Sequence, residues 1–192
     1  MIIKKGYVVT MDEDMRVYRD GAVVFRGDRI VDVGKTEDIM RKHSDDEVID
    51  AKGKMVLPGF VNTHNHLYQT IMRGLSDDGE GMRPEGYRWD IDLLRGLDRD
   101  ACYASGAMSM VEMIRSGITC TQDSHYINFH RDSINGIAES ARDVGLRLVL
   151  GRGSWDLQGL APEELTEDID TAMKESRNVS KRWHNGDMTK VI

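Results

Sequence analysis

The sequence predicts an α/β protein in two parts, residues 1–55 and residues 56–192. In the first part, short runs rich in β-branched residues are separated by turn residues, which is typical of strands joined by tight turns. In the second part, apolar runs of strand length alternate with stripes of helical spacing, which is typical of parallel βα units. Apolar residues make up 40% of the chain and charged residues 31%, an ordinary composition for a globular protein.

The first part is expected to hold short strands and one short helix. Gly27 and Asp28 form a Gly-x pair suited to a tight hairpin, and Thr36 is placed to cap the helix. Because few of these strands are long and apolar, the hairpins need a further sheet to pack against and bury their apolar face. The strands are expected at residues 7–10, 22–25, 30–33, 48–49 and 54–56, the last two paired around residues 51–53, and the helix at residues 36–42.

The second part is expected to hold strands and helices in alternation. Asp98 can cap a first helix that Gly117 ends, and Gly145 ends a second helix. Pro162 is expected to open a third helix. After a first strand that ends in His-Asn-His, further strands are expected at residues 118–123, 146–150 and 188–192.

The most informative pattern is His64-Asn65-His66, at the end of the apolar run that begins at Val56. Side chains alternate along a strand, so the two histidines would point to one face and Asn65 to the other. Two imidazoles on one face can both reach a divalent cation, at zinc–nitrogen distances of about 2.0–2.1 Å. Two surface histidines at a strand end are the alternative. The Pro-Gly pair and the strand before the histidines favour a metal site.

The same stretch resembles a known family. The motif Leu-Pro-Gly-Phe-Val-Asn-Thr-His-Asn-His at residues 57–66, continued by residues 67–70 and 72–74, is similar to the amidohydrolase superfamily, and residues 123–126 and 152–153 fit it too. The branch it resembles most is the chlorohydrolase and aminohydrolase group, which includes triazine hydrolases, 8-oxoguanine deaminase and S-adenosylhomocysteine deaminase. The resemblance implies the N-terminal part of a (β/α)8 TIM barrel, about three and a half βα units, preceded by strands of a small β-sandwich domain.

By this resemblance, the intact protein is a metal-dependent amidohydrolase that hydrolyses a carbon–nitrogen bond other than a peptide bond. One divalent metal ion, zinc or iron, held in part by His64 and His66, would lower the pKa of water toward about 7. The expected reaction is hydrolytic deamination of an aminated heterocycle, such as a purine, a pterin, an adenosyl compound or a triazine. The remaining ligands and the acid/base glutamate are expected beyond Ile192, so no catalytic residue is expected within this chain.

Three alternatives stay open at this point. A triazine-type chlorohydrolase would displace a halide with the same activated water, and a two-metal amidase or lactamase belongs to the same superfamily. The third alternative is an inactive, truncated barrel that needs a complementing piece. A (β/α)8 barrel takes about 250 residues, so we expect residues 1–192 alone to be neither catalytically active nor stably monomeric.

Four residues are expected to bind the substrate, because the active sites of such barrels lie at the carboxyl ends of the strands. Gln69 and Trp89 lie in the long connection of residues 67–97, whose length is typical of a binding loop or lid. His125 could face the site, although a histidine satisfied within the strand end is an equal alternative. Arg152 follows the third strand and could bind a heteroatom or a carboxylate; a surface arginine is the alternative.

Charge and cysteine content narrow the partners and the location. Lys and Arg number 26 against 33 Asp and Glu, a net charge of −7, which argues against nucleic acid and anionic membranes as partners. Cys102 and Cys120 form no zinc-finger pattern and indicate reduced thiols in a cytoplasmic protein. The amino terminus is too short and too polar for a signal peptide. We expect the complete protein to act on a small heterocyclic molecule, as a homo-oligomer.

Overall fold

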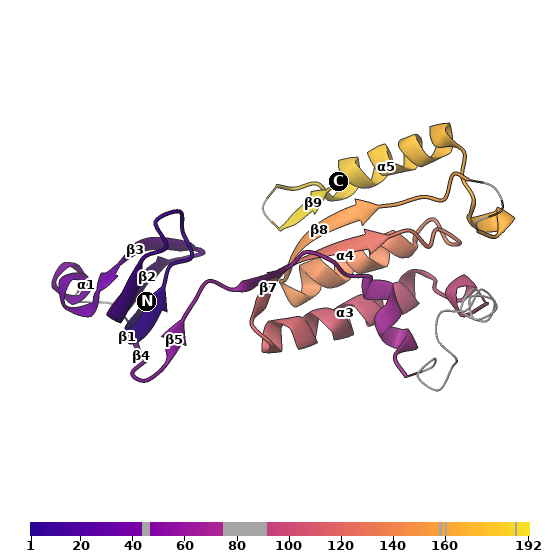
Figure 1. Cartoon of the computed structure of the whole chain (residues 1–192). Coiled ribbons are helices and arrows are strands. Elements are labelled where there is room, and N and C mark those ends of the chain that lie inside the picture. Colours follow the sequence, from indigo (N-terminus) through magenta and orange to yellow (C-terminus); the bar gives the residue numbers. More distant parts are fainter. Residues whose placement is uncertain (44–46, 75–91, 158, 160, 187) are drawn as a thin grey trace. The chain divides into compact units, whose positions relative to one another are not determined.

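The computed structural model describes residues 1–43, 47–74, 92–157, 159, 161–186 and 188–192. The chain divides into two compact units, Met1–Pro58 and Gly59–Ile192, each of which has its own sheet (Figure 1). Residues 56–58 therefore lie with the first unit, although the change of pattern in the sequence begins at Val56. Trp89, one of the expected substrate-binding residues, lies outside the described residues.

The first unit is a five-stranded sheet with one helix. Its elements are β1 (Ile2–Val9), β2 (Val17–Arg26), β3 (Arg29–Lys35), α1 (Thr36–Lys42), β4 (Val48–Asp50) and β5 (Met55–Val56). The strand order is β3-β2-β1-β4, and β5 also pairs with β1. The predicted hairpin is confirmed: β2 and β3 are antiparallel around Gly27, which has a φ of +59° that glycine adopts without steric cost. Ile2, Ala22, Val24 and Ile39 form the buried core of this unit.

Two expectations for the first unit are wrong. β4 and β5 do not pair with each other; both pair in parallel with β1, where Ile2 faces Val48 and Tyr7 faces Met55. The eight-residue β1 is long enough to offer one edge to both short strands. Thr36 is the first residue of α1 rather than its cap, because its hydroxyl instead accepts a hydrogen bond from the amide of Lys5 at 3.1 Å.

The second unit is a four-stranded parallel sheet connected by helices (Figure 1). Its strand order, β6-β7-β8-β9, follows the chain, and all three pairs are parallel. Because such crossovers are right-handed, successive helices cover the same face of the sheet. The elements are β6 (Phe60–Asn62), η1 (Leu67–Met72), α3 (Arg99–Arg115), β7 (Ile118–His125), α4 (Ser133–Val144), β8 (Arg147–Arg152), η2 (Glu163–Leu165), α5 (Ile169–Trp183) and β9 (Thr189–Val191).

The ends of the helices follow local signals in the sequence. As predicted, the Asp98 carboxylate caps α3 by accepting a hydrogen bond from the amide of Ala101, and Gly145 ends α4 in the left-handed conformation. The prediction that Pro162 opens the third helix is wrong, because it opens only the short 3-10 helix η2. The chain is then extended at Thr166, and α5 begins after its own cap, Asp168.

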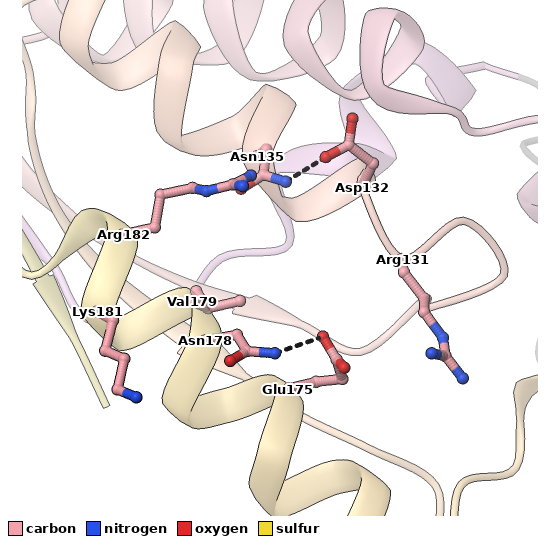
Figure 2. A pocket seen from close by; sticks show the side chains of 8 residues that line it. All are labelled: Arg131, Asp132, Asn135, Glu175, Asn178, Val179, Lys181 and Arg182. Atoms are coloured by element: carbon pink, nitrogen blue, oxygen red, sulfur yellow. Dashed lines mark hydrogen bonds between the residues drawn. The ribbon is translucent and has the colours of Figure 1, made fainter.

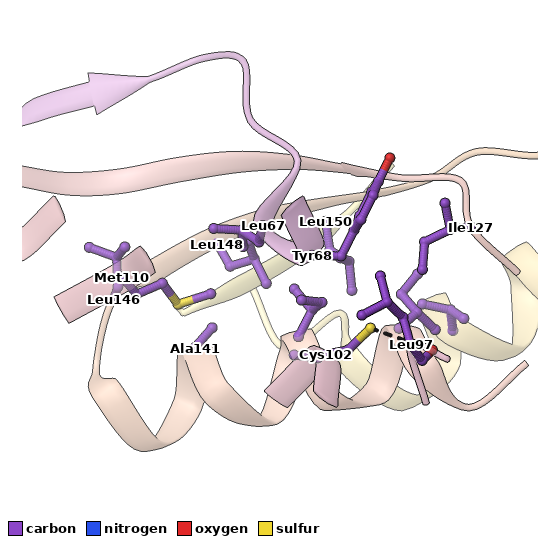
Figure 3. Close-up of a cluster of buried hydrophobic side chains, with 14 of the residues drawn as sticks. Leu67, Tyr68, Leu97, Cys102, Met110, Ile127, Ala141, Leu146, Leu148 and Leu150 are labelled. Carbon is purple, nitrogen blue, oxygen red and sulfur yellow. Dashed lines mark hydrogen bonds between the residues drawn. The ribbon is translucent and has the colours of Figure 1, made fainter. Parts of the chain in front are cut away.

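The main core lies between the sheet and helices α3 and α4 (Figure 3). Leu148 and Leu150 of β8 belong to the same buried cluster as Met110 of α3 and Ala141 of α4. Each fully buried leucine or methionine side chain contributes about 1.5–3 kcal/mol. The two helices approach closely at Gly136, where an added Cβ would lie 2.1 Å from the carbonyl oxygen of Arg99. None of the described helices is long and apolar enough to cross a membrane.

Strand β6 forms one edge of the parallel sheet among the described strands. Phe60 and Val61 on this strand are 59% and 61% exposed. An exposed apolar edge strand presents unpaired backbone groups to other chains.

We therefore predict that residues 1–192, expressed alone, self-associate through this edge. Val61→Lys should shift the chain toward monomer in sedimentation velocity, because a charge on an edge strand opposes pairing. Val111→Lys is the matched control, since Val111 is 47% exposed but lies on α3, away from a sheet edge. A monomeric parent chain, or an equal effect of the two substitutions, would contradict the prediction.

Candidate metal centre

The two expected metal ligands meet just beyond the end of a strand. β6 ends at Asn62, so His64 and His66 lie in the segment after it and not on the strand, as the alternation argument assumed. Their rings nevertheless meet edge to face, with centroids 5.0 Å apart. His64 is exposed and His66 is half-buried. The pair lies at the carboxyl end of a parallel strand, where active sites of this architecture are found.

One hydrogen bond sets the tautomer of the His66 ring. Its Nδ1 lies 2.9 Å from the backbone carbonyl oxygen of Ser124 on β7. A carbonyl oxygen only accepts hydrogen bonds, so Nδ1 carries the proton in this contact. The Nε2 atom of the neutral ring then keeps its lone pair. This is the arrangement by which metal-binding histidines are oriented, with the second nitrogen donating to a carbonyl or a carboxylate.

The segment that carries His66 is held by the end of β7. The amide of Ser124 donates to the carbonyl of Asn65 at 2.9 Å. The amide of Leu67 donates to the Asp123 carboxylate at 2.7 Å, and the carbonyl of Leu67 accepts from the Ser105 hydroxyl at 2.7 Å. Backbone and side-chain bonds together therefore fix residues 65–67 after β6 has ended.

Asp123 and His125 form a buried pair at the end of β7, and both are 0% exposed. The Nε2 atom of His125 lies 2.9 Å from the Ser133 hydroxyl, and Nδ1 lies 3.9 Å from Oδ2 of Asp123. Within the described residues, neither Nδ1 nor Oδ2 has a hydrogen-bond partner. Burial raises the pKa of Asp123 to about 7. Burial, helped by the charge of Arg152, lowers the pKa of His125 to about 3.

The structure encloses two of the four expected substrate-binding residues. His125 lies beneath Tyr68, with ring centroids 5.8 Å apart. The side chain of Arg152 is only 3% exposed, so the alternative of a surface arginine is wrong. Its guanidinium donates to the Glu167 carboxylate at 2.7 Å. The second carboxylate oxygen of Glu167 is buried and has no partner among the described residues.

Gln69 lies one turn beyond the histidine pair. Its amide donates to the carbonyl of His66 at 2.9 Å, and its exposed side chain lies 3.5 Å from the Tyr68 hydroxyl. This places Gln69 close to the pair, while Arg152 lies at the end of another strand, β8.

Three aromatic residues near the histidine pair were missed by the sequence analysis. Tyr126 packs edge to face on His66, with centroids 5.1 Å apart, and Trp155 packs on Tyr126 at 5.8 Å. Tyr68 contacts both His66 and Tyr126. Tyr126 directly follows β7 and Trp155 lies three residues after the end of β8, so their positions after strands were the signal that could have found them.

The histidine pair supplies two nitrogen donors at the end of β6, fewer than a catalytic metal site needs. Catalytic zinc sites use three protein ligands and keep one position open. Among residues 1–43, 47–74 and the later described ranges, no group of three or more His, Cys, Asp or Glu side chains could hold a metal ion. The donor set of two imidazoles, one with its tautomer fixed, therefore fits zinc or iron but does not complete the site.

A cavity of about 590 Å³ lies elsewhere in this unit, between α5 and the start of α4 (Figure 2). Arg131, Lys181 and Arg182 line it together with Asp132 and Glu175. Neither histidine of the pair lines it, nor do the other described candidates for substrate binding. This cavity and the candidate metal ligands therefore lie in different parts of the unit.

The opposite pKa shifts of Asp123 and His125 predict how stability depends on pH. Folded Asp123 keeps its proton up to about pH 7, and folded His125 stays neutral down to about pH 3. When the chain unfolds, their pKa values return to 3.8 and 6.5. Between these values the pair binds one proton in both states, so the two contributions to the pH dependence cancel.

We predict that single substitutions expose the two opposite slopes. In Asp123→Asn the free energy of unfolding should rise with pH between about 3 and 6.5, because the unfolded state binds the extra proton. In His125→Gln it should fall between about 3.8 and 7, because the folded state then binds it. Each slope is at most about 1.4 kcal/mol per pH unit. Urea unfolding of the metal-free native protein measures both, and slopes of equal sign would contradict the prediction.

Comparison with known proteins gives matches along most of the chain. The profile of the Amidohydrolase family matches residues 55–191, and that of the bacterial imidazolonepropionase-like composite domain matches residues 21–43. A 5'-deoxyadenosine deaminase of Methanothermobacter thermautotrophicus is 35% identical over 167 residues, which are 86% of this chain and 35% of that protein. A 5-methylthioadenosine/S-adenosylhomocysteine deaminase of Syntrophus aciditrophicus is 28% identical over 190 residues, 99% of this chain and 41% of that protein.

Solved structures show the same fold. A variant of atrazine chlorohydrolase from Arthrobacter aurescens TC1, complexed with zinc and atraton, superposes with a TM-score of 0.76 at 25% sequence identity. The match covers 99% of this chain and 45% of that one, so the chain spans less than half the length of the proteins it matches. The predicted fold class, the N-terminal part of an amidohydrolase TIM barrel preceded by short strands, is confirmed. The chain belongs to the amidohydrolase family.

Proposed function

We propose that the native protein is a metal-dependent amidohydrolase that deaminates an aminated heterocycle by hydrolysis. The observation that carries the proposal is the pair of His64 and His66 at the carboxyl end of β6, with the His66 tautomer set by the carbonyl of Ser124. Adenosyl compounds are the substrate class we favour, because the two deaminases compared above are named for 5'-deoxyadenosine and for methylthioadenosine and S-adenosylhomocysteine. A triazine-type chlorohydrolase is the second candidate, supported by the solved structure that resembles the chain.

In the proposed mechanism, His64 and His66 bind one zinc or iron ion, His66 through Nε2. The chemistry that such an ion supplies is acidification of water, whose pKa on zinc falls toward about 7. The hydrogen bond to Ser124 keeps the His66 ring in the ligating tautomer. The further ligands and the glutamate that protonates the leaving group are proposed to follow Ile192 in the native protein. Residues 1–192 alone are therefore proposed to be inactive.

We propose that Gln69, Trp89, His125 and Arg152 bind the substrate. Gln69 is supported by its exposed side chain beside the histidine pair. Arg152 is supported by its position at the end of β8, where Glu167 orients the guanidinium. His125 is enclosed, so contact with a substrate requires a neighbour such as Tyr68 to move. The homo-oligomeric state and the cytoplasmic location remain predictions.

The metal-binding role of the histidine pair can be tested directly. His64→Ala and His66→Ala, each made in the native protein, should remove most of the bound zinc or iron, because each deletes one of the few ligands of the ion. Far-UV circular dichroism should change little. His43→Ala is the control, since His43 lies in the first unit and pairs with Asp32. Stoichiometric metal in the double His64 and His66 variant, measured by atomic emission, would disprove the assignment.

The substrate role of Arg152 has its own test. Arg152→Ala should lower kcat/KM at least tenfold, about 1.4 kcal/mol, with metal content unchanged, because the residue is proposed to bind substrate and not metal. Glu167→Gln keeps Arg152 in place and should cost less. An equal loss in both variants would show that Arg152 acts through the buried ion pair. If substitutions of all four proposed residues leave kcat/KM within about twofold, the binding assignment fails.

A further inference from the structure

We propose that Asp123 is a positioning residue for the histidine pair. Its buried carboxylate binds the amide of Leu67 and thereby holds the His66 ring in its ligating orientation. This inference rests on the proposed metal-binding role of His64 and His66. It assigns to Asp123 a task that is neither metal ligation nor contact with the substrate.

The first argument concerns what holds the segment once the β6 ladder has ended. The ladder between β6 and β7 ends where Asn62 faces Thr121. Beyond that point, Ser124 binds the backbone of Asn65 and the ring of His66. The 2.7 Å bond from the Leu67 amide to Asp123 adds a third hydrogen bond from β7 to the two that Ser124 makes.

The second argument concerns the amide that Asp123 satisfies. Leu67 is the first residue of η1, and the first amides of a helix have no partner within it. The preceding residue, His66, makes no side-chain cap. Leu67 is also 0% exposed, so water cannot reach its amide and take the place of Asp123. Asp123 therefore caps η1 from strand β7, 56 residues away in the sequence.

The third argument is energetic. Burying a carboxylate is costly, and one oxygen of Asp123 has no hydrogen-bond partner among the described residues. A buried polar group left in this state requires an explanation beyond stability. The peptide group that Asp123 holds is the one that links His66 to Leu67, so its release would free the backbone next to the ring. Outer partners of this kind affect metal affinity about 10- to 100-fold.

The test compares Asp123→Ala with Asp123→Asn in the native protein. Asn keeps an oxygen acceptor for the Leu67 amide, whereas Ala removes it. Thr121→Val is the matched control, because Thr121 is equally buried on the same strand and makes only a 3.4 Å contact with the adjacent carbonyl of Gln122. The measurements are the dissociation constant for zinc and, in the metal-free protein, the His66 tautomer from ¹⁵N chemical shifts of labelled histidine.

We expect Asp123→Ala to raise the zinc dissociation constant about 10- to 100-fold and to mix the two His66 tautomers. Asp123→Asn and Thr121→Val should keep the zinc dissociation constant and the His66 tautomer of the parent. The proposal is overturned if Asp123→Ala keeps the parent affinity and tautomer, or if Asp123→Asn loses them. Should Asp123→Ala fail to fold, Asp123→Leu is measured in its place, because leucine fills the buried space and also lacks an acceptor for the Leu67 amide. A parent that binds no zinc refutes the proposed function instead, and the metal-free tautomer measurement still decides the role of Asp123.

Discussion

The parallel pairing of β7 with β6, and its continuation past the end of β6, is the constraint on which the candidate site depends. β6 has only three residues, so it cannot hold the following histidines by its own ladder. The end of β7 takes over this task through the backbone of Ser124 and the carboxylate of Asp123. The register of β7 is in turn fixed on its other side by six paired residues of β8. The position of the His66 ring is thus a consequence of sheet register.

The ends of β7 and β8 also concentrate buried polar groups. Asp123 and His125 end one strand, and Arg152, paired with Glu167, ends the next. A buried ion pair of this type adds little net stability, because desolvation offsets its attraction. The same ends carry unsatisfied atoms on Asp123, His125 and Glu167. Polar groups whose pKa values are shifted by burial cluster at functional sites in many proteins. Asp123 and His125 are two such groups, and they lie near the carboxyl end of a parallel strand, where this architecture performs its chemistry.

The cavity and the candidate metal ligands lie in different parts of the second unit. The cavity between α4 and α5 is lined by helix residues of mixed charge, such as Arg182 and Glu175, whereas the histidine pair lies at strand ends. Pockets are the usual first guess for an active site. Here we take the strand ends as the guide, because two imidazoles, one with its tautomer set by a carbonyl, are typical of metal ligands and a mixed-charge cavity between helices is not.

The sequence by itself determined the features that depend on local interactions. Caps such as Asp98 and Gly145, the order of strands and helices, and the His-x-His motif can all be recognised within a few residues, and the structure agrees with them. Only the tertiary structure decided that Asp123 binds Leu67, that Arg152 is buried against Glu167, and that β4 and β5 share one neighbour. These contacts join segments whose spacing leaves no periodic pattern in the sequence, because sheet register and the packing between elements are set by the whole core and not by neighbouring residues.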